Sequence, residues 1–170
     1  ILNTMATFKS GLSASADLYM SGFDTHANHD EDHEPNLAAL TTGINYLWHL
    51  AESYGLADRL VVYLSSDFGR TPHYNSSEGK DHWSVGSSII MANNPSWGNR
   101  VIGQTDAAQN TIKINPNTLK EDAVNGIDIE PKHVHDALRR ELGIAEEEMF
   151  SPYGLRTNGV HLDIFNPNLG

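Results

Sequence analysis

The chain has 170 residues, of which 22 are acidic and 11 are basic, so its formal charge is -11. A chain this acidic is a poor candidate for general nucleic-acid binding, which needs a basic surface. Because the sequence contains no cysteine, a disulfide framework and a thiolate metal site are both excluded. Any metal ion must then be held by His, Asp, Glu, Asn or backbone oxygen, a donor set that suits zinc, manganese, magnesium or calcium.

The length favours one domain with a real core, and we expect a single α/β domain or part of a larger one. No apolar run approaches the roughly 20 residues that a membrane span needs, so we expect no membrane insertion. The chain begins ILNTMATFKSG, without an initiator methionine and inside what reads as a helix. We therefore expect a fragment of a longer protein, in which case the lack of a signal peptide says nothing about its compartment.

The first predicted element is a short strand at 18–22, which runs into the polar stretch GFDTHANHDEDHEP. The next segment, NLAALTTGINYLWHLAESYG, carries apolar residues at steps of three and four and predicts an amphipathic helix. Asn36 is its expected N-cap and Gly55 its expected stop. The apolar run at 60–64 is typical of a strand covered on both faces. The order strand, helix, strand predicts a βαβ unit and a parallel sheet.

The second half of the chain carries weaker signals. A third strand is predicted around 88–92, and the segments NRVIGQT and TIKIN are typical of short strands or edge elements. The segment IEPKHVHDALRRELG predicts a second helix, with Pro131 near its first turn and Gly143 as its stop. The tail at 144–170 is rich in Gly, Pro and Asn, so we expect it to be irregular.

The loop after the first predicted strand is the first candidate metal site. Asp24 and His26 lie two residues apart, and residues at this spacing in an extended segment point to the same side. Their side chains can therefore converge on one cation, although a solvated polar loop would have the same composition. His29 and His33 would line up only on a helix, and Pro35 and the dense like charges argue against one. We interpret these two histidines as solvated, or as supports of ligands.

The second candidate group lies in LSSDFGRTP. Asp67 comes just past the carboxyl end of the apolar strand at 60–64, where open α/β sheets form their ligand crevice. Gly69 permits a tight turn, and Arg70 offers a planar guanidinium to an anion such as phosphate or sulfate. The structural alternative is an Asp that closes a turn and an Arg70 that pairs with a surface acid. Three polar groups at one strand end favour a functional role.

The third candidate group lies in EGKDHWS. His82 is flanked by Asp81 and Trp83, a setting that suits a metal ligand whose second ring nitrogen is held by a carboxylate. An isolated histidine would more often be structural, so His82 gains weight from the other two groups. The remaining histidines carry weaker signals; they are His49, His73, His133, His135 and His161.

Three motifs thus occur in order in this chain: GFDTH, SSDFGRTP and GKDHW. The set resembles an uncharacterised family of largely exported bacterial proteins, which looks like a branch of the alkaline phosphatase and sulfatase superfamily. The resemblance implies a three-layer α/β/α fold with a mainly parallel sheet, of which this chain would be the C-terminal part. It also implies a metal centre at the carboxyl ends of the strands and a periplasmic or exported location.

The same resemblance assigns four metal ligands in this chain. Asp24 and His26 would be the early Asp/His pair, Asp67 would match the acid of the middle motif, and His82 would be the late histidine.

Two departures from the superfamily pattern concern whether this chain carries all the metal ligands and catalytic residues. Phe68 stands where the superfamily has a histidine, so one ligand of a two-metal site is missing. The site would then hold one metal, or recruit a residue such as His73 or Asp81. The superfamily's nucleophile and its first metal-binding Asp lie upstream of the matched region, so this chain alone would lack a complete catalytic set.

These observations predict a metal-dependent hydrolase of phosphate or sulfate esters. The metal would act as a Lewis acid, and Arg70 and Lys80 would balance the charge of a small anionic ester. The alternative is a non-catalytic metal-binding or assembly domain derived from the same fold, for which Phe68 and the missing nucleophile are the motivation.

Overall fold

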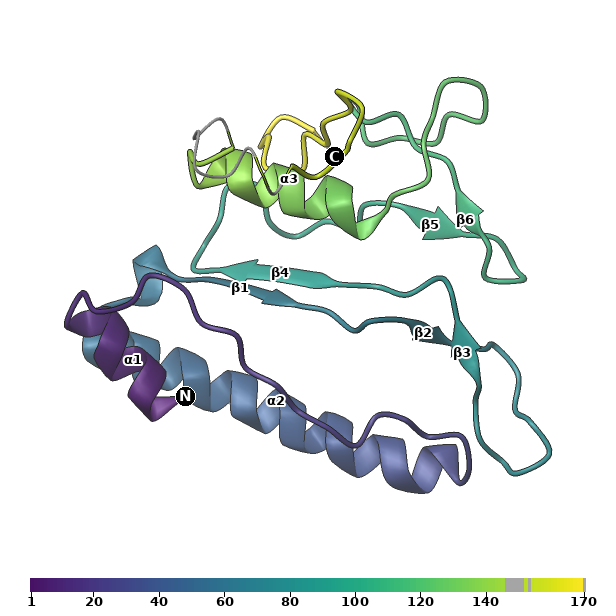
Figure 1. The fold of residues 1–170 in the computed structure, drawn as a ribbon, viewed down its shortest axis with the longest axis horizontal. Helices are drawn as coiled ribbons and strands as arrows, with labels where there is room; N and C mark the ends of the chain where they lie inside the picture. Colours follow the sequence, from purple (N-terminus) through teal and green to yellow (C-terminus); the bar gives the residue numbers. More distant parts are fainter. Residues whose placement is uncertain (146–151, 153, 170) are drawn as a thin grey trace. The chain divides into compact units, whose positions relative to one another are not determined.

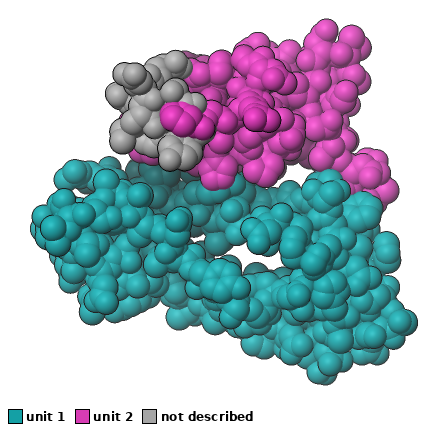
Figure 2. Space-filling model, in the orientation of Figure 1, with its two compact units in different colours: residues 1–94 teal, residues 95–170 magenta. Residues whose placement is uncertain are grey.

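The computed structural model of this chain describes residues 1–145, 152 and 154–169. Two compact units make up the chain, Ile1–Asn94 and Pro95–Gly170 (Figure 2). The first unit contains α1 (Leu2–Lys9), α2 (His29–Tyr54), the 3-10 helix η1 (Ala57–Arg59), β1 (Val61–Leu64), β2 (Gly69–Arg70), β3 (His82–Trp83) and β4 (Ile89–Ala92). The second contains β5 (Gln104–Thr105), β6 (Thr111–Ile112) and α3 (Pro131–Glu141) (Figure 1).

All strand pairs in the described residues are antiparallel and two-stranded: β1 with β4, β2 with β3, and β5 with β6. The prediction of a three-layer α/β/α fold with a mainly parallel sheet is therefore wrong. The strands at 60–64 and 88–92 do form, as β1 and β4, but Val61 pairs with Ala92 and Leu64 with Ile89. A parallel pair needs a long crossover, usually a helix. The chain between β1 and β4 has only the short strands β2 and β3 and loops, and it turns back on itself.

The predicted βαβ unit fails because its first strand is absent. Residues 18–22 are irregular. Gly22 has a φ of 99°, a left-handed conformation that interrupts an extended strand. Asn36 then ties this loop to α2, since its Nδ2 donates to the Gly22 carbonyl at 2.6 Å and to the Asp32 carbonyl at 2.8 Å. Asn36 therefore lies inside the helix and is not its N-cap.

Helix α2 begins at His29 and continues through Pro35, so the prediction that no stable helix forms around His29 and His33 is wrong. The N-terminal amides of α2 find partners in a distant loop: the Asn28 and His29 N–H groups donate to the carbonyls of Ser77 and Glu78 at 3.1 and 2.9 Å. These bonds satisfy donors that a helix start otherwise leaves unpaired. The acidic residues that suggested repulsion lie in the first turn, where the helix dipole favours negative charge.

The far end of α2 follows the sequence expectation. The helix stops at Gly55, which adopts the left-handed conformation with a φ of 66°. The last turns pack against α1 and η1 (Figure 1), and the buried core of the first unit consists of Met5, Leu47, Ala51 and Leu56. This core holds α2 at one end, while the site described below lies at its other end.

In the second unit, α3 begins at Pro131 and ends at Glu141, as its sequence predicts. His133 is buried and closes a capping box with Glu130. The described residues of the 144–170 tail contain neither an α-helix nor a β-strand, and the rest of that prediction lies outside the described residues. None of the described helices is long and apolar enough to cross a membrane.

Candidate metal centre

The three sequence motifs come together in the first unit through backbone pairing. The segment that follows Phe23 runs beside the segment at 75–82, with an antiparallel bridge between Ala27 and Glu78. The Lys80 N–H donates to the Thr25 carbonyl at 3.0 Å. A Cβ on Gly79 would lie 1.9 Å from the carbonyl carbon of His26, so only glycine permits this approach. The β2–β3 pair then sets Arg70 opposite His82.

Asp24, His26 and His82 converge at one point and form a group that could hold a metal ion. Asp24 Oδ1 lies 3.1 Å from His26 Nε2 and 3.2 Å from His82 Nε2. The two Nε2 atoms are 3.0 Å apart. These three atoms form a nearly equilateral triangle, which we call the donor triangle. All three residues are exposed, so the triangle opens to solvent.

The size of the donor triangle suits a divalent cation. Ligand atoms about 2.1 Å from one ion lie about 3.0 Å apart in an octahedral site and about 3.4 Å apart in a tetrahedral one. The three sides, 3.0 to 3.2 Å, fall in this range. Two imidazoles and one carboxylate are typical ligands of zinc, iron and related ions, and three protein ligands leave further positions open. The chemistry of the donor set therefore fits the metal that the sequence predicts.

Arg70 keeps the carboxylate of the triangle ionised. Its NH2 donates to Asp24 Oδ1 at 2.6 Å and to the Phe23 carbonyl at 2.9 Å, and its NH1 donates to the Lys80 carbonyl at 2.9 Å. The hydrogen bond from Arg70, followed by that from His82, lowers the pKa of Asp24 from 3.8 to about 2. The Arg70 side chain is only 14% exposed. Arg70 thus holds Asp24 in place, and the guanidinium N–H groups that make these three hydrogen bonds already have acceptors within the protein.

The two imidazoles are held by different partners. His26 Nδ1 lies 2.9 Å from Asp81 Oδ1, so the acid next to His82 in the sequence contacts the other histidine. The His82 ring stacks on Phe68, with centroids 3.7 Å apart and an interplanar angle of 23°. Each histidine therefore has a neighbour that restricts its orientation.

The remaining predicted site residues lie outside the donor triangle. Asp67 is exposed and is not a member of the group that converges on one point. Lys80 Nζ lies 4.9 Å from the centroid of the Tyr74 ring, a cation–π contact. The roles of Asp67 as a ligand and of Arg70 and Lys80 as partners of an anionic substrate stay predictions.

His29 and His33 lie on one face of α2 because the helix starts earlier than expected. Their rings stack with centroids 4.5 Å apart, and His29 Nδ1 is 2.6 Å from Thr25 Oγ1. Burial lowers the pKa of both histidines, which favours neutral rings at neutral pH. Thr25 is itself buried between two members of the triangle. The pair therefore packs against the loop that carries Asp24 and His26 through the Thr25–His29 contact, and its role as a support of metal ligands stays a prediction.

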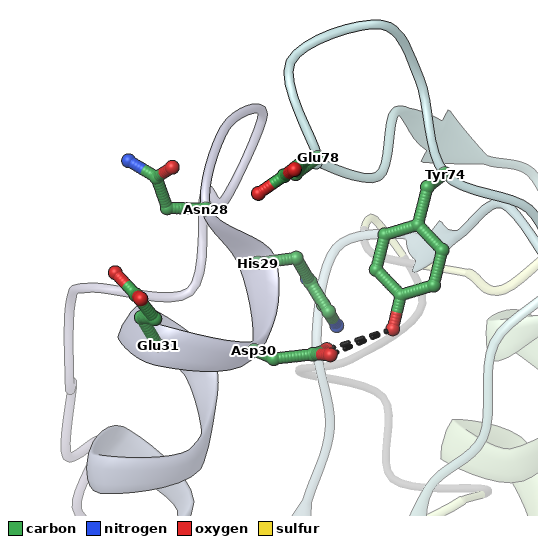
Figure 3. A pocket seen from close by; sticks show the side chains of 6 residues that line it. All are labelled: Asn28, His29, Asp30, Glu31, Tyr74 and Glu78. Carbon is green, nitrogen blue, oxygen red and sulfur yellow. Dashed lines mark hydrogen bonds between the residues drawn. The ribbon is translucent and has the colours of Figure 1, made fainter.

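A shallow pocket of about 260 Å³ lies beside the start of α2 (Figure 3). Tyr74 forms one wall, and its hydroxyl donates to Asp30 Oδ1 at 2.8 Å. The lining residues are Asn28, His29, Asp30, Glu31, Tyr74 and Glu78. None of them belongs to the donor triangle, so the pocket and the candidate metal centre are separate features.

Sequence reasoning missed Asn75, which joins several parts of this site. Its Nδ2 donates to Asp81 Oδ1 and to the His26 carbonyl, both at 3.0 Å. Its Oδ1 accepts from the Ser77 and Gly79 amides at 2.9 and 3.0 Å. An asparagine in a loop usually closes a turn, and Asn75 does so too. The one available signal was its position shortly after the SSDFGRTP motif.

The antiparallel fold and the donor triangle describe a domain with a candidate site for one metal ion. The chain belongs to a family of proteins of unknown function, DUF1501, which it matches over residues 10–160. The prediction of an uncharacterised family is thereby confirmed, and the link to the alkaline phosphatase and sulfatase superfamily stays a prediction. Comparison with curated proteins found no match, and comparison with solved structures found none either.

Proposed function

We propose that Asp24, His26 and His82 bind one divalent cation and that the protein is a metal-dependent hydrolase of phosphate or sulfate esters. The observation that carries the metal site is the donor triangle, whose sides are 3.0 to 3.2 Å and which brings His82 to Asp24 and His26 from more than fifty positions away in the chain. Imidazole nitrogens and a carboxylate oxygen are donor types that zinc and related divalent cations take.

Two features favour a catalytic role over a purely structural one. A closed structural zinc site uses four protein ligands, whereas catalytic sites keep a position open. The donor triangle supplies three ligands, and all three residues are exposed to solvent. A bound cation would supply Lewis-acid chemistry there, while Arg70 keeps Asp24 ionised and oriented.

The substrate class rests on the motif resemblance and on local positive charge. An anionic ester approaching a chain with a formal charge of -11 needs compensating cations near the site. Lys80 is the residue that we propose for this role, because it lies two positions before His82 in the GKDHW motif. Arg70 contributes its charge, although its donors already bind protein acceptors. We extend the proposal to an exported location, as the motif resemblance implies.

A metal-binding or assembly domain without turnover is the second candidate function. The ring of Phe68 stacks directly on His82 and restricts one side of the metal centre, which is the observation that favours this reading. The two functions share the metal site and differ only in turnover.

Metal content and turnover together test the proposal. The full-length protein is stripped with a chelator, loaded with zinc, manganese, magnesium or calcium in turn, and assayed on aryl phosphates and aryl sulfates. We expect one ion per chain and ester hydrolysis, both lost in His26→Ala and His82→Ala. His49→Ala is the matched control, because the His49 side chain is 79% exposed on α2 and does not belong to the donor triangle.

Each outcome of this experiment has one meaning. Bound metal without turnover of either ester class selects the second candidate function. A wild-type protein that binds none of the four ions contradicts the metal site itself. Asp67→Ala is measured in parallel, because loss of the ion in this variant would add Asp67 to the ligands.

A further inference from the structure

We infer that Asp81, held in place by Asn75, is a positioning residue that fixes which ring nitrogen of His26 faces the donor triangle. The consequence for metal affinity rests on the proposed function. The tautomer of His26 is a property of the chain without metal, so it is testable by itself.

The contact geometry determines the direction of the hydrogen bond. His26 Nδ1 lies 2.9 Å from Asp81 Oδ1, and an ionised carboxylate can only accept hydrogen bonds. Asn75 Nδ2 donates to the same Asp81 Oδ1 at 3.0 Å, and aspartate side chains are ordinarily ionised at neutral pH. Nδ1 of His26 therefore carries the proton.

A neutral imidazole with a proton on Nδ1 has its free lone pair on Nε2. Nε2 is the atom of His26 that lies 3.1 Å from Asp24 and 3.0 Å from His82. The opposite tautomer would direct an N–H into the donor triangle, where it would donate to Asp24 and leave no lone pair for a cation. Asp81 thus favours the one tautomer in which His26 can be a ligand.

Asp81 is itself held from both sides. Its backbone is fixed to Thr71, whose N–H donates to the Asp81 carbonyl at 2.9 Å and whose Oγ1 accepts from the Asp81 N–H at 3.2 Å. Its carboxylate accepts from Asn75 Nδ2, and the same amide group donates to the His26 carbonyl, both at 3.0 Å. Asn75 therefore connects the carboxylate to the backbone of the histidine that it orients.

The competing interpretation is an incidental surface pair. The side chains of His26 and Asp81 are 46% and 56% exposed, and exposed pairs of this kind contribute little to stability. A surface pair would leave the tautomer of His26 and the metal affinity unchanged when Asp81 is replaced. Replacing a carboxylate that holds a metal-ligating histidine typically weakens metal binding by about 10–100-fold.

The experiment compares three replacements of acidic residues. Asp81→Ala removes the acceptor, Asp81→Asn keeps an oxygen that can accept from His26, and Asp17→Asn changes an exposed acid outside the site. Two-bond hydrogen–nitrogen NMR spectra of the metal-free protein at about pH 8, where imidazoles are mostly neutral, report which ring nitrogen of His26 carries the proton. Zinc affinity is measured by competition with a chromophoric chelator.

We expect the wild-type protein, Asp81→Asn and Asp17→Asn to show the proton on Nδ1, and Asp81→Ala to shift it to Nε2. We expect zinc to bind about 10–100-fold more weakly to Asp81→Ala, and with wild-type affinity to Asp17→Asn. A proton on Nδ1 in Asp81→Ala would overturn the inference, as would a shifted proton with unchanged zinc affinity. A wild-type protein that binds no zinc, but whose His26 tautomer depends on Asp81, supports the positioning role and contradicts the proposed function.

Discussion

Replacing Arg70 by Met tests how the donor triangle keeps its carboxylate charged. Met retains the length and the apolar stem of Arg but donates no hydrogen bond to Asp24. Because the Arg70 hydrogen bond is the largest cause of the lowered pKa of Asp24, we expect this pKa to rise from about 2 toward the ordinary value of 3.8. The contacts of Asp24 with His82 and His26 persist, so the rise stops short of 3.8.

The change is large enough to measure directly. At about pH 3, a carboxyl group with a pKa of about 2 is about 10% protonated, whereas one with a pKa of 3.8 is about 85% protonated. Carbon-detected NMR of the Asp24 carboxyl follows this titration. Arg59→Met is the matched control, since Arg59 lies in η1 among the exposed residues and leaves the titration of Asp24 unchanged.

The same pKa fixes the sign of a stability effect. Because the pKa of Asp24 in the folded chain is below 3.8, its ionised form stabilises the folded state above pH 3.8, and this contribution is lost as the pH falls toward 2. In Arg70→Met this contribution is smaller, and its loss again begins near pH 3.8 but ends at a higher pH, because only the pKa of the folded state rises. An Asp24 titration that stays near pH 2 in this variant would refute the role of Arg70, and would leave His82 as the principal partner.

Two further predictions concern the packing that supports the site. Gly79→Ala places a Cβ 1.9 Å from the His26 carbonyl carbon, so we expect it to lower the free energy of unfolding by about 1–3 kcal/mol and to weaken metal binding. Gly43→Ala is the control, because Gly43 lies in the interior of α2 with no atom near the added Cβ. We expect this variant to be neutral or more stable by about 0.5–1 kcal/mol. Equal effects of the two glycine replacements on urea unfolding would contradict the close approach at Gly79. Met5 is 1% exposed, so we expect Met5→Ala to lower the free energy of unfolding by about 2–5 kcal/mol. Leu12 is 82% exposed, so Leu12→Ala should lower it by less than about 0.5 kcal/mol. Equal unfolding midpoints of these two variants would contradict the assigned core.

Local patterns in the sequence predicted the elements better than their arrangement. The body and the end of α2, the strands β1 and β4, and α3 each follow from apolar spacing or from a terminal Gly or Pro. The start of α2 was missed because its first amides bond to the carbonyls of Ser77 and Glu78, a contact that no local pattern reveals. Strand direction was missed because an apolar, β-branched run fits either kind of pairing.

For the site too, the sequence predicted the residues involved better than the contacts between them. The three short motifs predicted a metal centre of Asp24, His26, Asp67 and His82, and the structure groups all of these except Asp67. Which acid holds which histidine was not predictable, because Asp81 is adjacent to His82 in the chain yet bonds to His26. That choice depends on how two loops pair, and the pairing depends on the close approach at Gly79.

The candidate metal centre is tested most directly by anomalous diffraction from crystals of the protein loaded with zinc, measured on both sides of the zinc absorption edge. We expect one peak, about 2.1 Å from Asp24 Oδ1 and from the Nε2 atoms of His26 and His82. A peak at Asp30, Glu31 or Glu78 beside Tyr74, or no peak in a zinc-loaded crystal, would contradict a metal centre at the donor triangle.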